Sequence, residues 1–157
     1  MKGASFCWVT VIVLSGCAAN FPPTEAARST LQFVDVQQFD RELGASLAAP
    51  LPHVEVSLYD RIAPSALPSR LQRWLGASDQ GGGKFRVVPA PGTVVPKNPL
   101  LLVSMISSLW SGNKMAKEIA AESRLRVARN YDVRMFLRQD EHGDTFVDRI
   151  IFDQRTR

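Results

Sequence analysis

Residues 131–152 read YDVRMFLRQDEHGDTFVDRIIF, and their pattern is the strongest structural signal in the chain. Apolar side chains occupy every second position of its first half, which is the two-residue period of a strand that buries one face. The polar run 140–144 is typical of a turn, so the stretch predicts a C-terminal β-hairpin. Asp148 interrupts the apolar face of the returning strand, and it requires either a shifted register or a polar partner. The apolar positions are Tyr131, Val133, Met135 and Leu137 in the first strand, and Phe146, Ile150 and Phe152 in the second.

Two helices are expected before this hairpin. Pro99 opens a segment that runs to Trp110 and is apolar nearly all round. Ser111-Gly112-Asn113 breaks or kinks the chain, and a second helix is expected over 114–128. Its narrow apolar side contains Ala121, Leu125 and Ala128.

Two further strands are expected earlier in the chain. Residues 54–59 alternate between apolar and polar side chains, and residues 84–88 read KFRVV. Apolar residues at helical spacing over 67–75 lie between them, and Gly81-Gly82-Gly83 is expected to be a flexible connection. Because a helix joins these two strands, we expect a parallel pair with a right-handed crossover.

One more helix is expected over residues 36–47, with Asp35 as its N-cap. The whole pattern predicts an α+β (α/β-like) fold. It consists of a small mixed sheet with a β-α-β unit, two later helices and a C-terminal β-hairpin.

The first 17 residues have the parts of an export signal. Lys2 gives a cationic start, and residues 4–13 form an apolar core. That core is shorter than the about 20 residues that cross a bilayer permanently. Leu14-Ser15-Gly16-Cys17 resembles the lipobox of bacterial lipoproteins, in which cleavage precedes an acylated cysteine. The resemblance implies a lipid anchor on Cys17, with palmitate-type acyl chains holding the protein to the membrane.

This resemblance sets the expected domain organisation. Residues 1–16 are expected to be a signal peptide, residues 17–30 a lipidated tether, and residues 31–157 a single periplasmic domain. Ala18 stands where Asp is associated with retention in the inner membrane, so the outer membrane is the expected destination. An ordinary secretory signal with a chance cysteine is the alternative.

The composition argues against several functional classes. The net charge of +4 comes from interspersed charges rather than from a basic block, so we expect no nucleic-acid partner. Cys7 leaves with the signal and Cys17 receives lipid, so no cysteine remains for a metal site or a nucleophile. His53 and His142 are expected to be surface residues without a ligand role. We therefore expect no cofactor, no metal and no enzymatic activity.

The order of elements over residues 54–153 resembles the small α/β domain of CsgG-type and TolB amino-terminal proteins. The similarity rests on residues 84–88 and on Asn130-Tyr131-Asp132-Val133-Arg134, which follows an alanine-containing helix. Members of these families include envelope lipoproteins that assemble secretion pores or activate cell-wall synthases. The sequence 56–60 departs from the family's first strand, and the resemblance identifies no functional residue.

These observations predict an envelope-anchored, non-enzymatic scaffold, assembly factor or regulator, with an envelope protein as its partner. An envelope hydrolase and a carrier of lipid or another apolar ligand are the alternatives. The apolar helix is expected either to be buried beside the sheet or to dock against a partner. For docking, the contact residues would be Leu101, Met105, Leu109 and Trp110.

Overall fold

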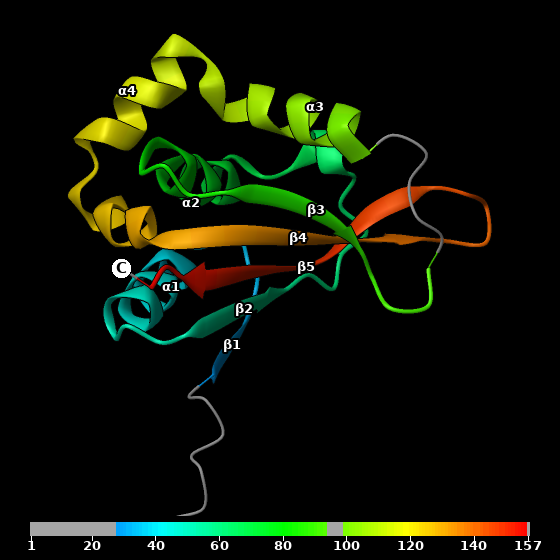
Figure 1. Cartoon of the computed structure of the whole chain (residues 1–157), viewed down its shortest axis with the longest axis horizontal. Helices are drawn as coiled ribbons and strands as arrows, with labels where there is room; N and C mark the ends of the chain where they lie inside the picture. The colour runs from blue at the N-terminus through cyan, green and yellow to red at the C-terminus, as the bar shows by residue number, and fades with distance from the viewer. Residues whose placement is uncertain (1–27, 94–98, 157) are drawn as a thin grey trace, which may run out of the picture.

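The computed structural model describes residues 28–93 and 99–156, which form a five-stranded mixed sheet with helices packed on one face (Figure 1). The predicted α+β class is confirmed. The strands are β1 (Arg28–Gln32), β2 (His53–Ser57), β3 (Phe85–Pro89), β4 (Tyr131–Gln139) and β5 (Thr145–Gln154). The helices are α1 (Gln37–Ala48), α2 (Ser69–Gln80), α3 (Pro99–Ser111) and α4 (Asn113–Ala121), with 3₁₀ helices η1 (Pro64–Ala66) and η2 (Ser123–Asn130).

The strands lie in the order β1-β2-β5-β4-β3. The expected hairpin is β4 and β5, and β5 takes the central position between β4 and β2, antiparallel to both. Strands β2 and β3 run parallel as expected, but they are not direct neighbours, because β5 and β4 separate them. The parallel neighbours are instead β1 with β2, joined through α1, and β3 with β4, joined through α3, α4 and η2.

Strand β1 also corrects the expected boundary of the tether. The chain joins the sheet at Arg28, three residues before the predicted start of the domain at residue 31. Only Leu31 in this strand is apolar, which explains why no alternating pattern reveals it. Leu31 nevertheless packs against the core.

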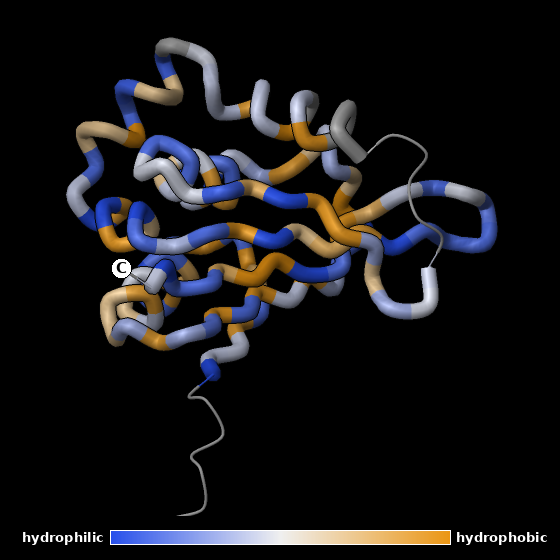
Figure 2. Tube along the Cα trace, in the orientation of Figure 1, coloured by the Kyte–Doolittle hydropathy of each residue, from blue (hydrophilic) through white to orange (hydrophobic). Residues whose placement is uncertain are grey.

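The hydrophobic core lies between the sheet and its helices. Figure 2 shows the hydrophobic positions along the central strands alternating with hydrophilic ones. Trp74 of α2 is fully buried, and Trp110 of α3 packs edge-on against Phe85 of β3 with 5.3 Å between ring centroids. Other core side chains include Leu43, Val54, Val56, Leu71, Val133, Met135, Ile150 and Phe152.

The expected helix over 114–128 is two helices. The chain becomes extended at Glu122, which separates α4 from the 3₁₀ helix η2. Leu125 and Ala128 are buried as expected, whereas Ala121 is exposed. Asp35 does not cap α1 either, because Val36 takes the N-cap position and Asp35 binds Arg70 at 2.8 Å.

The glycine triplet packs closely against neighbouring backbone, which corrects the expectation of a flexible connection. A Cβ atom on Gly83 would lie 2.3 Å from the carbonyl oxygen of Tyr131, and one on Gly81 would lie 2.6 Å from that of Arg129. Gly82 has a φ of +77°, in the left-handed region that favours glycine. The triplet is therefore a tight turn between α2 and β3.

The register between β4 and β5 shifts between Phe136 and Leu137, and this shift explains why Asp148 interrupts the apolar pattern of β5. Beyond this bulge Val147 takes the buried position that we expected Phe146 to hold. Asp148 finds a polar partner, Arg138 of the neighbouring strand, at 3.0 Å. A β-bulge changes which residues of a strand face the core, and this accounts for the difference.

Candidate functional site

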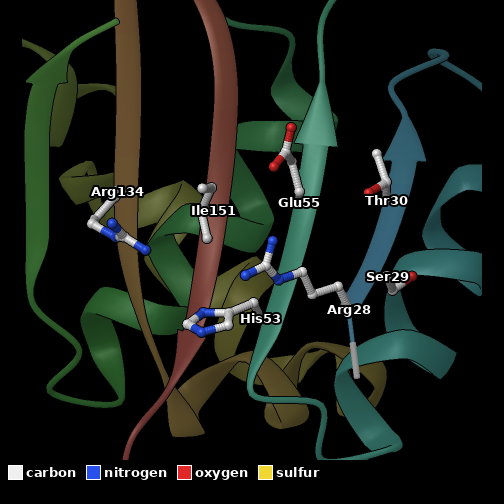
Figure 3. A pocket seen from close by; sticks show the side chains of 7 residues that line it. All are labelled: Arg28, Ser29, Thr30, His53, Glu55, Arg134 and Ile151. Atoms are coloured by element: carbon white, nitrogen blue, oxygen red, sulfur yellow. The ribbon is translucent and has the colours of Figure 1, made fainter. Parts of the chain in front are cut away.

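The face of the sheet opposite the core carries an ordered array of polar side chains, and we call it the open face. In the close-up of Figure 3, the side chains of this face stand in front of the sheet and the helices lie behind it. The strand register fixes which residues are neighbours across the sheet. One row contains Arg28, His53, Asp153 and Asp132, and the next contains Thr30, Glu55, Ile151, Arg134 and Arg86.

Asp153 organises the centre of the open face. Its carboxylate accepts hydrogen bonds from Arg134 Nε at 2.5 Å and from Arg134 Nη2 at 2.8 Å. It also lies 2.6 Å from His53 Nδ1. The hydrogen bond to Asp153 raises the pKa of Arg134 above its ordinary value. Asp153 thus fixes the orientation of one cation and of one imidazole ring.

These groups border a shallow hollow with a volume of about 200 Å³. Ile151 lies between the polar side chains, and Arg28 reaches across β2 towards His53 (Figure 3). Ligand pockets usually measure about 300–1,000 Å³, so this hollow suits one functional group of a larger partner. Its lining residues are Arg28, Ser29, Thr30, His53, Glu55, Arg134 and Ile151.

His53 has no hydroxyl nucleophile as a partner in the described part of the chain. A nucleophilic hydroxyl activated by histidine would hydrogen-bond to the free ring nitrogen. Within residues 28–93 and 99–156, His53 hydrogen-bonds to Asp153 alone. The hydroxyl of Ser29, a residue that also lines this hollow, instead bonds Ser46 of α1 at 3.1 Å.

The most deeply buried carboxylate has a structural role. Asp40 of α1 is only 3% exposed and accepts a hydrogen bond from Trp74 Nε1 at 2.8 Å. Arg70 of α2 also binds it, and Arg124 of η2 lies 3.4 Å away. Asp40 therefore joins three helices on the covered side of the sheet.

The predicted docking residues on α3 divide into two groups. Trp110 is 1% exposed and donates from Nε1 to Asp79 at 3.3 Å, so it is a core residue rather than a docking residue. Leu109 is half-buried and packs against the same core. The side chains of Leu101 and Met105 lie outside the described residues, as does Cys17.

Sequence reasoning missed the group formed by His53, Arg134 and Asp153. His53 lies at the surface as expected, and its ring contacts Asp153, a residue 100 positions away. Polar residues at alternate positions of β2 and β4 signal an exposed sheet face. The sequence does not show that β5 lies between these strands, and this pairing brings the three side chains together.

Comparisons with known proteins add no relative. No protein-family model matches the chain, and no similar protein was found among curated proteins or solved structures. Within the described ranges, no helix is long and apolar enough to cross a membrane, and no group of three or more potential metal ligands gathers.

Proposed function

We propose that this chain is an envelope lipoprotein, anchored through Cys17, whose periplasmic domain binds a protein partner through the open face. In this role the protein is a scaffold, assembly factor or regulator, without enzymatic activity of its own. The lipobox-like sequence 14–17 supports the anchor. The observation that carries the binding role is the open face itself, where Asp153 holds Arg134 and His53 in fixed orientations. Pre-oriented charged groups lose little freedom when a partner binds.

The short connection to the proposed anchor supports a localised role. Arg28 follows Cys17 by eleven residues (28 − 17), which reach at most about 40 Å even when fully extended. The sheet would therefore stay close to the membrane, and its effective concentration for partners in that layer would rise. Ala18 favours the outer membrane as the destination.

The anchor is tested by intact-mass analysis of membrane fractions from cells that express the natural protein or Cys17→Ser. We expect a mature chain that starts at Cys17 and carries added acyl mass, and we expect the substitution to abolish both features. Density separation of the two membranes then assigns the destination. A soluble, unacylated chain in both strains would overturn the anchor and leave an exported domain.

A hydrolase is the second candidate, and the contact between His53 and Asp153 is the observation that favours it. A histidine oriented by a carboxylate is a common general base. The test compares hydrolysis of cell-wall fragments by the natural protein and by His53→Gln. Activity that disappears in the variant would establish this alternative. Ile106 and Trp110 fill the core, so nothing observed favours the carrier of an apolar ligand.

A further inference from the structure

A second and larger hollow lies at one corner of the domain, where α2, η2 and β5 all end. We call it the corner hollow. Its volume is about 760 Å³, within the range of about 300–1,000 Å³ that is usual for ligand pockets. Gly81 contributes backbone, and the polar side chains that line it are Gln80, Arg129, Asn130, Gln154, Arg155 and Thr156.

The lining contains two guanidinium groups, three primary amides and one hydroxyl, but no carboxylate. Arg155 is fixed in place because its Nη2 donates to the carbonyl oxygen of Gly81 at 2.9 Å and to that of Arg129. The Nε atom of Arg129 is buried, and no hydrogen-bond partner for it exists in the described part of the chain. The guanidinium fork matches the oxygens of a phosphate, and such charge-assisted hydrogen bonds are strong.

The surrounding charges also favour an anion. Lys84 directly precedes β3 at this end of the sheet, and Arg28 begins β1. Three carboxylates at the same end are already engaged: Asp79 accepts from Trp110 Nε1, Asp132 accepts the backbone N–H of Lys84, and Asp153 binds Arg134 and His53. Arg129 and Arg155 therefore face no carboxylate among the residues that line the corner hollow.

The corner hollow is also close to the point where the chain enters the sheet. The register pairs Arg28 with His53 and His53 with Asp153, so the end of β5 lies two strands from Arg28, or about 10 Å. This separation is much shorter than the reach of the eleven residues that follow Cys17. A membrane surface at the proposed anchor is thus within reach of the hollow.

We propose that the corner hollow binds a phosphate group through Arg129 and Arg155, and that a phospholipid headgroup beside the anchor supplies it. The phosphate chemistry follows from the lining alone, whereas the headgroup as its source rests on the proposed function. Binding there would fix the orientation of the domain on the membrane and leave the open face accessible to a partner.

The test follows thermal unfolding of the full-length protein in dodecyl maltoside micelles while inorganic phosphate replaces chloride at constant ionic strength. Asn130→Asp with Gln154→Glu places two carboxylates in the hollow without removing Arg129 or Arg155. Gln32→Glu with Gln37→Glu, at exposed positions away from the hollow, is the matched control with the same change in net charge. Phosphate stabilises proteins generally, so the difference between the two variants is the readout.

Phosphate at ten times its dissociation constant should raise the midpoint by about 4 °C more in the natural and control proteins than in the hollow variant. Equal shifts in all three proteins would overturn the proposal. Phosphatidylglycerol added to the micelles should reproduce the shift and abolish the further effect of phosphate. An undiminished phosphate effect in its presence would overturn the headgroup as the source. If Cys17 proves unacylated, the anchor fails, while the phosphate titration still decides the site.

Discussion

The two faces of the sheet are formed by the same strands, but one face carries buried apolar side chains and the other carries polar and charged ones. On the covered face, Val54 of β2, Val133 of β4 and Phe152 of β5 lie side by side and are almost inaccessible to solvent. Their sequence neighbours His53, Arg134 and Asp153 meet on the open face, where they form a charged group. Alternate side chains of a strand point to opposite faces, so one segment can supply both stability and recognition. Substitutions on the covered face should therefore reduce stability, and those on the open face should reduce binding.

The largest effect is expected from Asp40→Ala on the covered side. The change leaves Trp74 Nε1 without its acceptor and leaves the partly buried Arg70 with Asp35 as its remaining partner. An unpaired buried donor costs about 1–3 kcal/mol in the free energy of unfolding, and the lost ion pair adds to this cost. Urea unfolding followed by tryptophan fluorescence measures this loss. Glu42→Ala on the exposed side of the same helix is the control, and a similar loss there would contradict the assigned role of Asp40.

The next effect is expected from Gly83→Ala in the turn between α2 and β3. A Cβ atom at this position would overlap the carbonyl oxygen of Tyr131 and the hydroxyl of Ser78. Overpacking of this kind costs about 1–3 kcal/mol, and here backbone must move. Gly112→Ala is the matched control, since nothing lies within 4 Å of its added methyl group. If both variants unfold at the natural midpoint, the turn is not tightly packed.

A smaller and pH-dependent effect is expected from Tyr131→Phe. The Tyr131 hydroxyl donates to the carbonyl oxygen of Leu47 at 2.9 Å, and its loss should cost about 1 kcal/mol at neutral pH. Burial raises the pKa of Tyr131 above the ordinary value of 10.0. A raised pKa means that this stability is fully present below pH 10 and is lost as the pH rises towards the folded-state value.

Unfolding midpoints between pH 8 and pH 12 test this pH dependence. The natural protein should lose stability more steeply above pH 10 than Tyr131→Phe does. Tyr59→Phe is the control, because Tyr59 is 76% exposed. In that variant Tyr131 is the only tyrosine, so tyrosinate absorbance reports on it alone. Ionisation of Tyr131 near pH 10 without unfolding would contradict its burial.

The smallest effect on stability is expected from Arg134→Gln on the open face. Its ion pair with Asp153 is partly solvated, and such pairs contribute less than about 1 kcal/mol. Arg138→Gln, which breaks the pair with Asp148 near the end of β4, is the matched control. Both should unfold near the natural midpoint. A loss as large as that of Asp40→Ala would show that the charged group on the open face is structural.

The sequence predicts the local elements better than their assembly. Alternation in residues 131–137 and 54–58 identifies β4 and β2, and helical spacing identifies α1 and α2. Pairing between distant strands leaves no such local pattern, so the central place of β5 and the contact of His53 with Asp153 were not predicted. Strand β1 has one apolar residue, and the bulge after Phe136 changes the buried face without an obvious signal.

Some features of the candidate site can be predicted from the sequence, whereas others are visible only in the folded structure. The lipobox-like residues are contiguous, so sequence alone identifies Cys17 as the proposed lipid attachment point. The apolar character of α3 was compatible with either docking or burial. Trp110 is buried because its indole fits between Phe85 and Asp79, which are distant in the sequence. The surface around Arg134 depends on the order of the strands and could be found only in the folded structure.

Site-specific photocrosslinking in intact cells tests whether the open face binds a protein partner. A photoreactive amino acid replaces Thr30 on the open face or Gln38 on the exposed side of α1. We expect a discrete protein adduct from position 30 that disappears when Arg134→Gln is added, and none from position 38. An adduct from position 38 alone, or an adduct from position 30 that persists with Arg134→Gln, would contradict recognition through the open face.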